Sequence, residues 1–310
     1  LVAGPIVRYT TVAEEIDEGH EAVSEFSAGA VRFLFGLGKK MLLANAVARI
    51  ADAAFAAVMP SVLFAWLGAV AYTFQIYFDF SAYSDMAIGL GRMFGFHFLE
   101  NFNYPYVARS VTEFWRRWHI SLSTWFRDYV YIPLGGNRCS RARNVWNLFV
   151  VWFLTGMWHG ASWNFIAWGL WFFVLLVGEK LLWGKALECL PSLVRHAYAM
   201  VLVVFSWVLF RAETLTAAAA YFAAMFGSSG VWCGSRVVYY ALEFWPELLC
   251  CCIAALPVKQ WLETALQKRD AAPARAVLTW GPKLAAMTLL ACSYCKLVTG
   301  SFNPFIYFRF

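Results

Sequence analysis

Residues 151–165 read Val151-Trp-Phe-Leu-Thr-Gly-Met-Trp-His159-Gly-Ala-Ser-Trp-Asn-Phe165, an apolar stretch with a histidine near its centre. An ionisable side chain at bilayer depth is costly, so it usually faces a polar cavity or a partner and serves a function. The pKa of histidine, ordinarily about 6.5, also suits proton transfer at neutral pH. His159 is therefore the first candidate catalytic residue. A buried histidine bonded to a backbone carbonyl is the alternative.

The apolar block around this histidine, residues 145–183, is too long for one crossing of a membrane. As a single helix it would extend for about 58 Å, nearly twice the hydrocarbon core of about 30 Å. Gly156 and Gly160 permit a break in the helix or a close approach of the backbone. The sequence therefore predicts two helical segments that meet near Gly156–Ser162, with His159 at their junction.

The composition of the chain indicates an integral membrane protein. Of its 310 residues, 61% are hydrophobic and 14% are charged, whereas soluble domains average about 45–50% apolar and 25% charged residues. The net charge of +6 is scattered, so anionic lipid headgroups explain it better than nucleic acid does. We predict an all-α membrane protein that forms one domain over residues 1–310.

Most of the other apolar stretches contain interruptions. Charged residues or proline interrupt residues 31–59, 61–80, 237–256 and 284–299, while residues 197–210 are uninterrupted but short. At membrane depth, irregular backbone is tolerated only where it is buried in protein or lines a water-filled cavity. The pattern therefore predicts a multi-pass bundle of broken helices. The positive-inside rule places the basic loop before residue 145 in the cytoplasm.

A second polar cluster surrounds His119, in the sequence Thr112-Glu-Phe-Trp-Arg-Arg-Trp-His119-Ile-Ser-Leu-Ser-Thr-Trp-Phe-Arg127-Asp128. On a continuous helix Glu113 can pair with Arg116 or Arg117, and His119 faces the residues four positions away. The tryptophans make this element amphipathic and suited to an interface. His119 supplies a second titratable group, for a proton relay or for orienting a substrate.

Arg138 ends a glycine-containing turn at residues 133–138. Arg116, Arg117 and Arg138 are candidates to hold the phosphates of a donor; contact with lipid headgroups is the alternative for the first two.

Two carboxylates, Asp79 and Asp85, lie near the end of an apolar stretch. We expect them to pair with arginines such as Arg116 or Arg127 and to brace the cavity. The chain has no G-x-S-x-G elbow, H-E-x-x-H zinc motif or P-loop. We therefore expect chemistry that uses no bound metal, no bound cofactor and no serine nucleophile.

Four segments, Tyr77–Asp85, Glu113–His119, Tyr131–Arg138 and Met157–Phe165, together resemble the membrane-bound O-acyltransferase (MBOAT) family. The resemblance covers the whole chain and is to the bacterial polysaccharide branch, which includes alginate O-acetylation proteins and teichoic acid D-alanyl transferases. It implies a ring of tilted, broken and re-entrant helices around a central tunnel. Family members usually have further N-terminal spans, so we expect this chain to lack them.

The resemblance also implies roles for individual residues. The nearly invariant histidine of the family corresponds to His159, and a second histidine of the bacterial branch corresponds to His119. The C-terminal residues 303–310 also resemble this branch and make Tyr307 a candidate carrier of the acyl group, with an aromatic interfacial anchor as the alternative.

The implied reaction moves a small acyl group, usually acetyl, from a cytoplasmic thioester such as acetyl-CoA to a hydroxyl of a polysaccharide or cell-wall polymer outside. It implies the bacterial cytoplasmic (inner) membrane as location and an exported SGNH-hydrolase-like acetyltransferase as partner.

Two other classes of function stay open on the residues alone. Broken helices, buried histidines and a cavity also suit a proton-coupled transporter or a flippase for lipid-linked sugar. A non-catalytic scaffold for an exported partner is the third possibility. A transporter moves its substrate intact, whereas an acyltransferase releases a free thiol from its donor.

Overall fold

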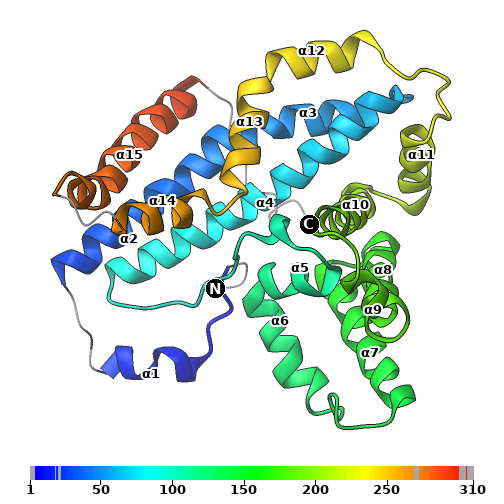
Figure 1. Ribbon diagram of the computed structural model, residues 1–310, viewed down its shortest axis with the longest axis horizontal. Coiled ribbons are helices and arrows are strands. Elements are labelled where there is room, and N and C mark those ends of the chain that lie inside the picture. The colour runs from blue at the N-terminus through cyan, green and yellow to red at the C-terminus, as the bar shows by residue number, and fades with distance from the viewer. Residues whose placement is uncertain (1–3, 18, 20–21, 269–271, 300–304, 306–310) are drawn as a thin grey trace. The chain divides into compact units, whose positions relative to one another are not determined.

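The computed structural model of the chain describes residues 4–17, 19, 22–268, 272–299 and 305 (Figure 1). Across these residues the backbone forms helices and connecting segments and no strand, so the all-α prediction is confirmed. The chain divides into two compact units that are each discontinuous in sequence. Unit 1 comprises Leu1–Val47, Phe74–Tyr104 and Pro246–Arg309, and unit 2 comprises Ala48–Thr73 and Pro105–Trp245. The single domain over residues 1–310 stays a prediction.

Four helices of the described residues are long and apolar enough to cross a membrane: Val62–Met93, Trp163–Glu188, Ser192–Arg211 and Ala272–Thr299. A pair bent by 64°, Ser235–Glu243 and Trp245–Ala254, is a fifth candidate. The bend coincides with the interruption predicted within residues 237–256. Residues 31–59, with their basic interruptions, are helical over most of their length but are not among these candidates.

Unit 1 contains most of the helices from the two ends of the chain. Its elements are α1 (Tyr9–Asp17), α2 (Val23–Gly38), η1 (Lys39–Ala44), the second part of α4 (Val62–Met93), α13 (Trp245–Ala254), α14 (Val258–Gln267) and α15 (Ala272–Thr299), while α3 (Asn45–Phe55) begins in this unit and ends in unit 2. Helices α2 and α4 approach closely at glycines. A methyl group added to Gly36 would lie 2.8 Å from the carbonyl oxygen of Ala82, an approach typical of small residues in membrane helix pairs.

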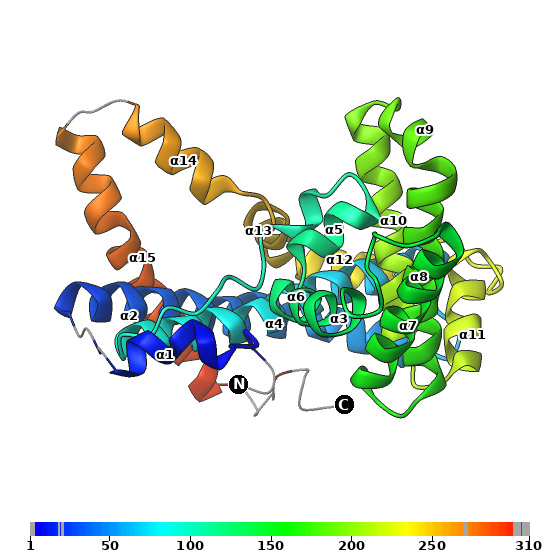
Figure 2. The same ribbon diagram turned by 90° about the horizontal axis from the view of Figure 1, so that it is seen from below.

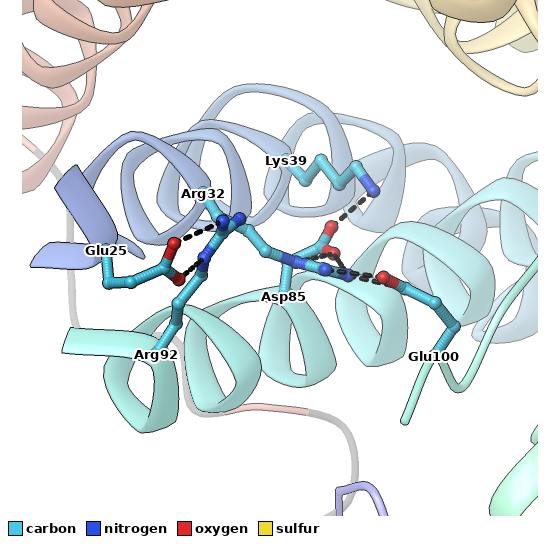
Figure 3. Close-up of polar contacts among 6 residues, drawn as sticks. All are labelled: Glu25, Arg32, Lys39, Asp85, Arg92 and Glu100. Atoms are coloured by element: carbon cyan, nitrogen blue, oxygen red, sulfur yellow. Dashed lines mark hydrogen bonds and ion pairs between the residues drawn. The ribbon is translucent and has the colours of Figure 1, made fainter. Parts of the chain in front are cut away.

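Ion pairs join the same two helices of unit 1 (Figure 3). Asp85 of α4 accepts hydrogen bonds from Arg32 at 2.9 Å and from Lys39 at 2.6 Å, and Asp79 pairs with buried Lys40. The expectation that arginines of the tryptophan-rich segment hold Asp85 was therefore wrong. The sequence pattern favoured the nearest arginine-rich motif, whereas the partners come from α2 (Arg32) and the adjoining η1 (Lys39).

Unit 2 contains the two histidine motifs. Besides the first part of α4, its elements are η2 (Pro105–Val107), α5 (Val111–Arg117), α6 (Ile120–Phe126), η3 (Arg127–Tyr131), α7 (Arg141–His159), α8 (Trp163–Gly178), η4 (Glu179–Trp183), α9 (Gly184–Glu188), α10 (Ser192–Arg211), α11 (Leu215–Met225) and α12 (Ser235–Glu243). Its largest buried side chains are aromatic, on the first part of α4 and on α5, α8 and α10. Ring contacts between α5, α8 and α10 form the core beside the histidines.

Helices α7 and α8 form the predicted hairpin and lie side by side (Figures 1 and 2). Helix α7 begins after Ser140, whose hydroxyl accepts a hydrogen bond from the Arg143 N–H, and it ends at His159. Gly160 follows with φ of 152°, a conformation that favours glycine. A methyl group on Gly156 would lie 2.6 Å from the Phe165 carbonyl oxygen. The prediction of two segments meeting at Gly156–Ser162 is confirmed.

Replacing Gly156 with alanine tests this close approach. The added methyl would also lie 3.1 Å from the Cα of Ile166, so backbone must move, and overpacking of this kind costs about 1–3 kcal/mol. We expect Gly156→Ala to unfold at a lower temperature in detergent. The control is Gly281→Ala in α15, where the new methyl meets Val277 at an ordinary 3.7 Å. Equal melting temperatures for Gly156→Ala and the unchanged chain would contradict the packing.

Candidate active site

His159 is the last residue of α7, and aromatic rings surround its imidazole. The ring centroids of Trp168 and Phe210 lie 4.8 and 5.1 Å from that of His159, both nearly perpendicular to it. The side chain is half-buried. Across the described residues no group is hydrogen-bonded to the His159 imidazole. The described residues thus contain no backbone carbonyl bonded to this ring, and the catalytic role of His159 stays a prediction.

Asn164 fixes the chain segment that follows His159. Its side-chain N–H donates to the Ala212 carbonyl at 2.6 Å, and its carbonyl oxygen accepts from the Ser162 hydroxyl. Asn164 is only 3% exposed, so leaving these groups unpaired would be costly. Because Ala212 directly follows α10, this contact ties the start of α8 to the helix that carries Phe210. The aromatic wall beside His159 is held in this way.

His119 lies in a break between two helices, where the sequence predicted one continuous helix. Helix α5 ends at Arg117, Trp118 is extended, and His119 has φ of 45° and ψ of 53° before α6 begins. The expectation that His119 contacts residues four positions away on one helix face was therefore wrong, because no continuous helix runs through it. A residue other than glycine in the left-handed region is strained by roughly 1–3 kcal/mol and is often found at functional sites.

The two histidines share a neighbour. The ring centroid of Trp158 lies 6.1 Å from that of His119 and 4.9 Å from that of His159. His119 is 2% exposed. Burial lowers the pKa of the His119 imidazole well below its usual range, and the charge of nearby His159 lowers it further. Both effects favour the neutral form of the imidazole over the protonated one.

The three candidate arginines differ in their surroundings. Arg117 pairs with Glu113 at 2.9 Å, as the i,i+4 spacing predicts, and Glu113 also accepts the backbone N–H of Arg109. Although burial raises the pKa of Glu113, these two contacts lower it overall. The side chains of Arg116 and Arg138 are exposed. Their role in holding donor phosphates stays a prediction.

A hydrogen-bond network that the sequence reasoning missed holds the turn before α7. The side-chain N–H groups of Asn144 donate to the Gly136 carbonyl at 2.8 Å and to the Tyr131 hydroxyl at 2.7 Å. The Tyr131 hydroxyl donates in turn to Asn137 at 2.7 Å. These contacts fix the backbone next to Arg138. The only signal for Asn144 in the sequence was an amide at the edge of an apolar block.

The structure thus gathers His159, His119, Glu113 and the candidate arginines in unit 2 and places Asp79 and Asp85 in unit 1. Tyr307 lies outside the described residues.

Comparison with known proteins identifies the family to which these motifs belong. A model of the membrane-bound O-acyltransferase family matches residues 1–219, which include both histidines. The chain belongs to the MBOAT family. Together with its apolar helices, this membership makes the chain a multi-pass membrane acyltransferase.

Three relatives of this MBOAT member carry different names. The probable alginate O-acetylase AlgI of Azotobacter vinelandii is 41% identical, over 100% of this chain and 67% of that protein. The peptidoglycan O-acetyltransferase of Helicobacter pylori is 37% identical, over 74% of this chain and 45% of that protein. The teichoic acid D-alanyltransferase of Bacillus subtilis is 33% identical, over 45% of this chain and 38% of that protein.

Two substitutions of His119 test its backbone conformation. Asparagine tolerates the left-handed region, whereas a β-branched residue does not. We expect His119→Val to be less stable than His119→Asn by roughly 1–2 kcal/mol, measured as a lower melting temperature of the purified protein in detergent. Both variants lose the imidazole, so their difference isolates the backbone. If valine were tolerated as well as asparagine, the break at His119 would be wrong.

Proposed function

We propose that this MBOAT member moves a small acyl group, acetyl in the first instance, from a cytoplasmic thioester such as acetyl-CoA. The acyl group passes towards hydroxyls of a polysaccharide or cell-wall polymer outside the bacterial cytoplasmic membrane. The observation that carries this proposal is the pair of imidazoles, on His159 and His119, that share Trp158 as a neighbour. The names of the relatives, which include alginate, peptidoglycan and teichoic acid, support acceptors of this class.

In this mechanism His159 acts as general base. Its imidazole takes the proton of the acceptor hydroxyl while the hydroxyl oxygen attacks the carbonyl carbon of the thioester. The tetrahedral intermediate collapses, the carbon–sulfur bond breaks, and the departing thiolate takes the proton from the imidazolium. The products are an ester and a free thiol, so atoms and charges balance. General base catalysis of this kind contributes roughly 10²–10⁴-fold in rate.

His119 orients the donor or relays the proton between its neighbour and solvent. The exposed side chains of Arg116 and Arg138, together with Arg117, supply positive charge for the phosphates of a coenzyme A donor. The donor is a substrate in this scheme, and no bound cofactor is needed. An exported SGNH-hydrolase-like acetyltransferase is the expected partner that completes transfer to the polymer.

Replacing the proposed base tests the reaction. We expect His159→Ala to insert and fold normally but to lose about 10²–10⁴-fold in kcat/KM, measured as thiol release from acetyl-CoA by the purified protein with a hydroxyl acceptor. His97→Ala, which removes an exposed histidine of unit 1 paired with Glu15, is the matched control and should retain activity. Acetyl ester at the level of the unchanged chain in a His159→Ala strain would defeat the assignment.

The same assay separates the acyltransferase from a transporter or flippase. A transporter would carry its substrate across vesicles intact and release no thiol. Uptake of intact substrate without thiol release would therefore favour that alternative.

A tyrosine near the C-terminus is the proposed intermediate carrier of the acyl group. The phenol of Tyr307, with a usual pKa of about 10, would need a base, and His159 is that base in the proposal. We expect Tyr307→Phe to retain an aromatic anchor and to lose transfer to the polymer, with no acetyl-tyrosine in peptides from the C-terminus by mass spectrometry. Unchanged acylation by Tyr307→Phe would reject the carrier role.

A further inference from the structure

We infer that Glu179 and Lys180, adjacent residues of η4, are positioning residues that hold the two donor-side elements of unit 2. Glu179 holds helix α5, which leads to His119. Lys180 holds the turn that ends in Arg138. This inference rests on the proposed function for its kinetic consequences, whereas the contacts themselves stand on the structure alone.

Glu179 binds the first turn of α5 with both carboxylate oxygens. One oxygen accepts the Val111 N–H at 2.7 Å, and the other accepts the Thr112 N–H at 2.8 Å and the Thr112 hydroxyl at 2.6 Å. Glu179 is 8% exposed. A carboxylate at a helix N-terminus satisfies N–H groups that have no partner within the helix and interacts favourably with the helix dipole.

These contacts determine where α5 starts, and α5 is short. The next N–H in line, that of Glu113, donates to the Ser110 hydroxyl at 2.9 Å. The first three N–H groups of α5 are therefore all bonded to side chains. The helix is only 7 residues long, so its start lies two turns from the strained break at His119. A shift at the start of α5 would therefore be passed on to the imidazole.

Lys180 makes the matching contacts on the other side. Its ammonium group donates to the side-chain oxygens of Asn137 at 2.6 Å and of Asn144 at 2.7 Å. Asn137 precedes Arg138 directly, and Asn144 lies in the first turn of α7. Lys180 thus connects the turn to the helix that ends at His159. Both partners are neutral asparagines, so these two contacts do not neutralise the charge of the ammonium group.

The backbone of η4 brings both side chains into place. This π-helix is bracketed by Gly178 and Gly184, and each glycine is needed there. A methyl group on Gly178 would collide with the Trp183 ring, and one on Gly184 would collide with the Glu179 carbonyl. Short π-helical segments are rare and are frequent at functional sites. Ionisable side chains within a candidate membrane span are likewise functional more often than not, and Trp163–Glu188 is such a span.

The two contacts have different kinetic consequences. Glu179 acts on the position of the His119 imidazole, so its loss should lower kcat. Lys180 acts on the donor-side turn, so its loss should raise the KM for the thioester. Misplacement of a catalytic group by about 1 Å can cost roughly 10²-fold, and a KM change with constant kcat reports lost ground-state binding.

The experiment compares Glu179→Gln and Lys180→Met in the full chain, purified in detergent, with acetyl-CoA as donor and thiol release as readout. We expect roughly tenfold lower kcat for Glu179→Gln and roughly tenfold higher KM for Lys180→Met, with Lys180→Arg partly restored. The matched controls are Glu188→Gln and Lys185→Met. These two residues are exposed on α9, a few positions along the chain, and their substitution should leave both constants unchanged.

Amide hydrogen exchange supplies a readout that does not depend on activity. Glu179→Gln should speed exchange in peptides covering residues 111–119, and Lys180→Met should do so in peptides covering 133–144. Unchanged exchange in both regions would overturn the inference. So would an equal loss of kcat in the two variants that merely matched the fraction of unfolded protein in each preparation. If the unchanged chain released no thiol while the exchange differences appeared, the proposed function would fail and the two contacts would stand.

Discussion

The backbone-to-backbone approach of α7 and α8 at Gly156 is the constraint on which the active site depends. A hairpin this tight needs glycine at the contact, and it needs a break just beyond it at Gly160. His159 is the last residue of α7, one helical turn beyond Gly156 and directly before Gly160. Its ring is then placed by the side chains of the returning helix and of α10, since Trp168 and Phe210 contact it from these two elements. Among the described residues, packing against these rings is therefore what positions the catalytic candidate.

Polar contacts hold the elements around that packed centre. Asn164 ties the hairpin to the end of α10, and Glu179 with Lys180 ties it to α5 and to the turn before α7. Asn164 and Glu179 are buried, and each would be costly to bury without partners. Each has its partners on a different element, so breaking one contact would release that element from the hairpin. Two buried polar groups, Asn164 and Glu179, and the exposed Lys180 thus specify an arrangement that apolar packing alone would leave less defined.

The sequence predicted the features that follow from local pattern. The helix break at Gly156–Ser162 followed from block length and glycine position, and the Glu113–Arg117 pair followed from i,i+4 spacing. The sequence-based predictions were wrong where contacts between distant segments determine the structure. The partners of Asp85 are Arg32 on α2 and Lys39 on η1, both far from it in sequence. The left-handed backbone at His119 carries no local signature, because neither glycine nor proline marks it. Glu179 and Lys180 appeared only as charges at the end of an apolar block.

The division of the chain into two units bears on the order in which they can form during synthesis. Among the described residues, every segment of unit 2 precedes residue 246, whereas unit 1 combines segments from before, between and after those of unit 2. Within unit 1, Gly38 of α2 packs against Leu289 of α15. Domains generally fold as their residues leave the ribosome. Unit 2 can therefore fold before α15 is synthesised. Until α15 packs against α2, we expect lipid or the insertion machinery to contact the face of α2 around Gly38.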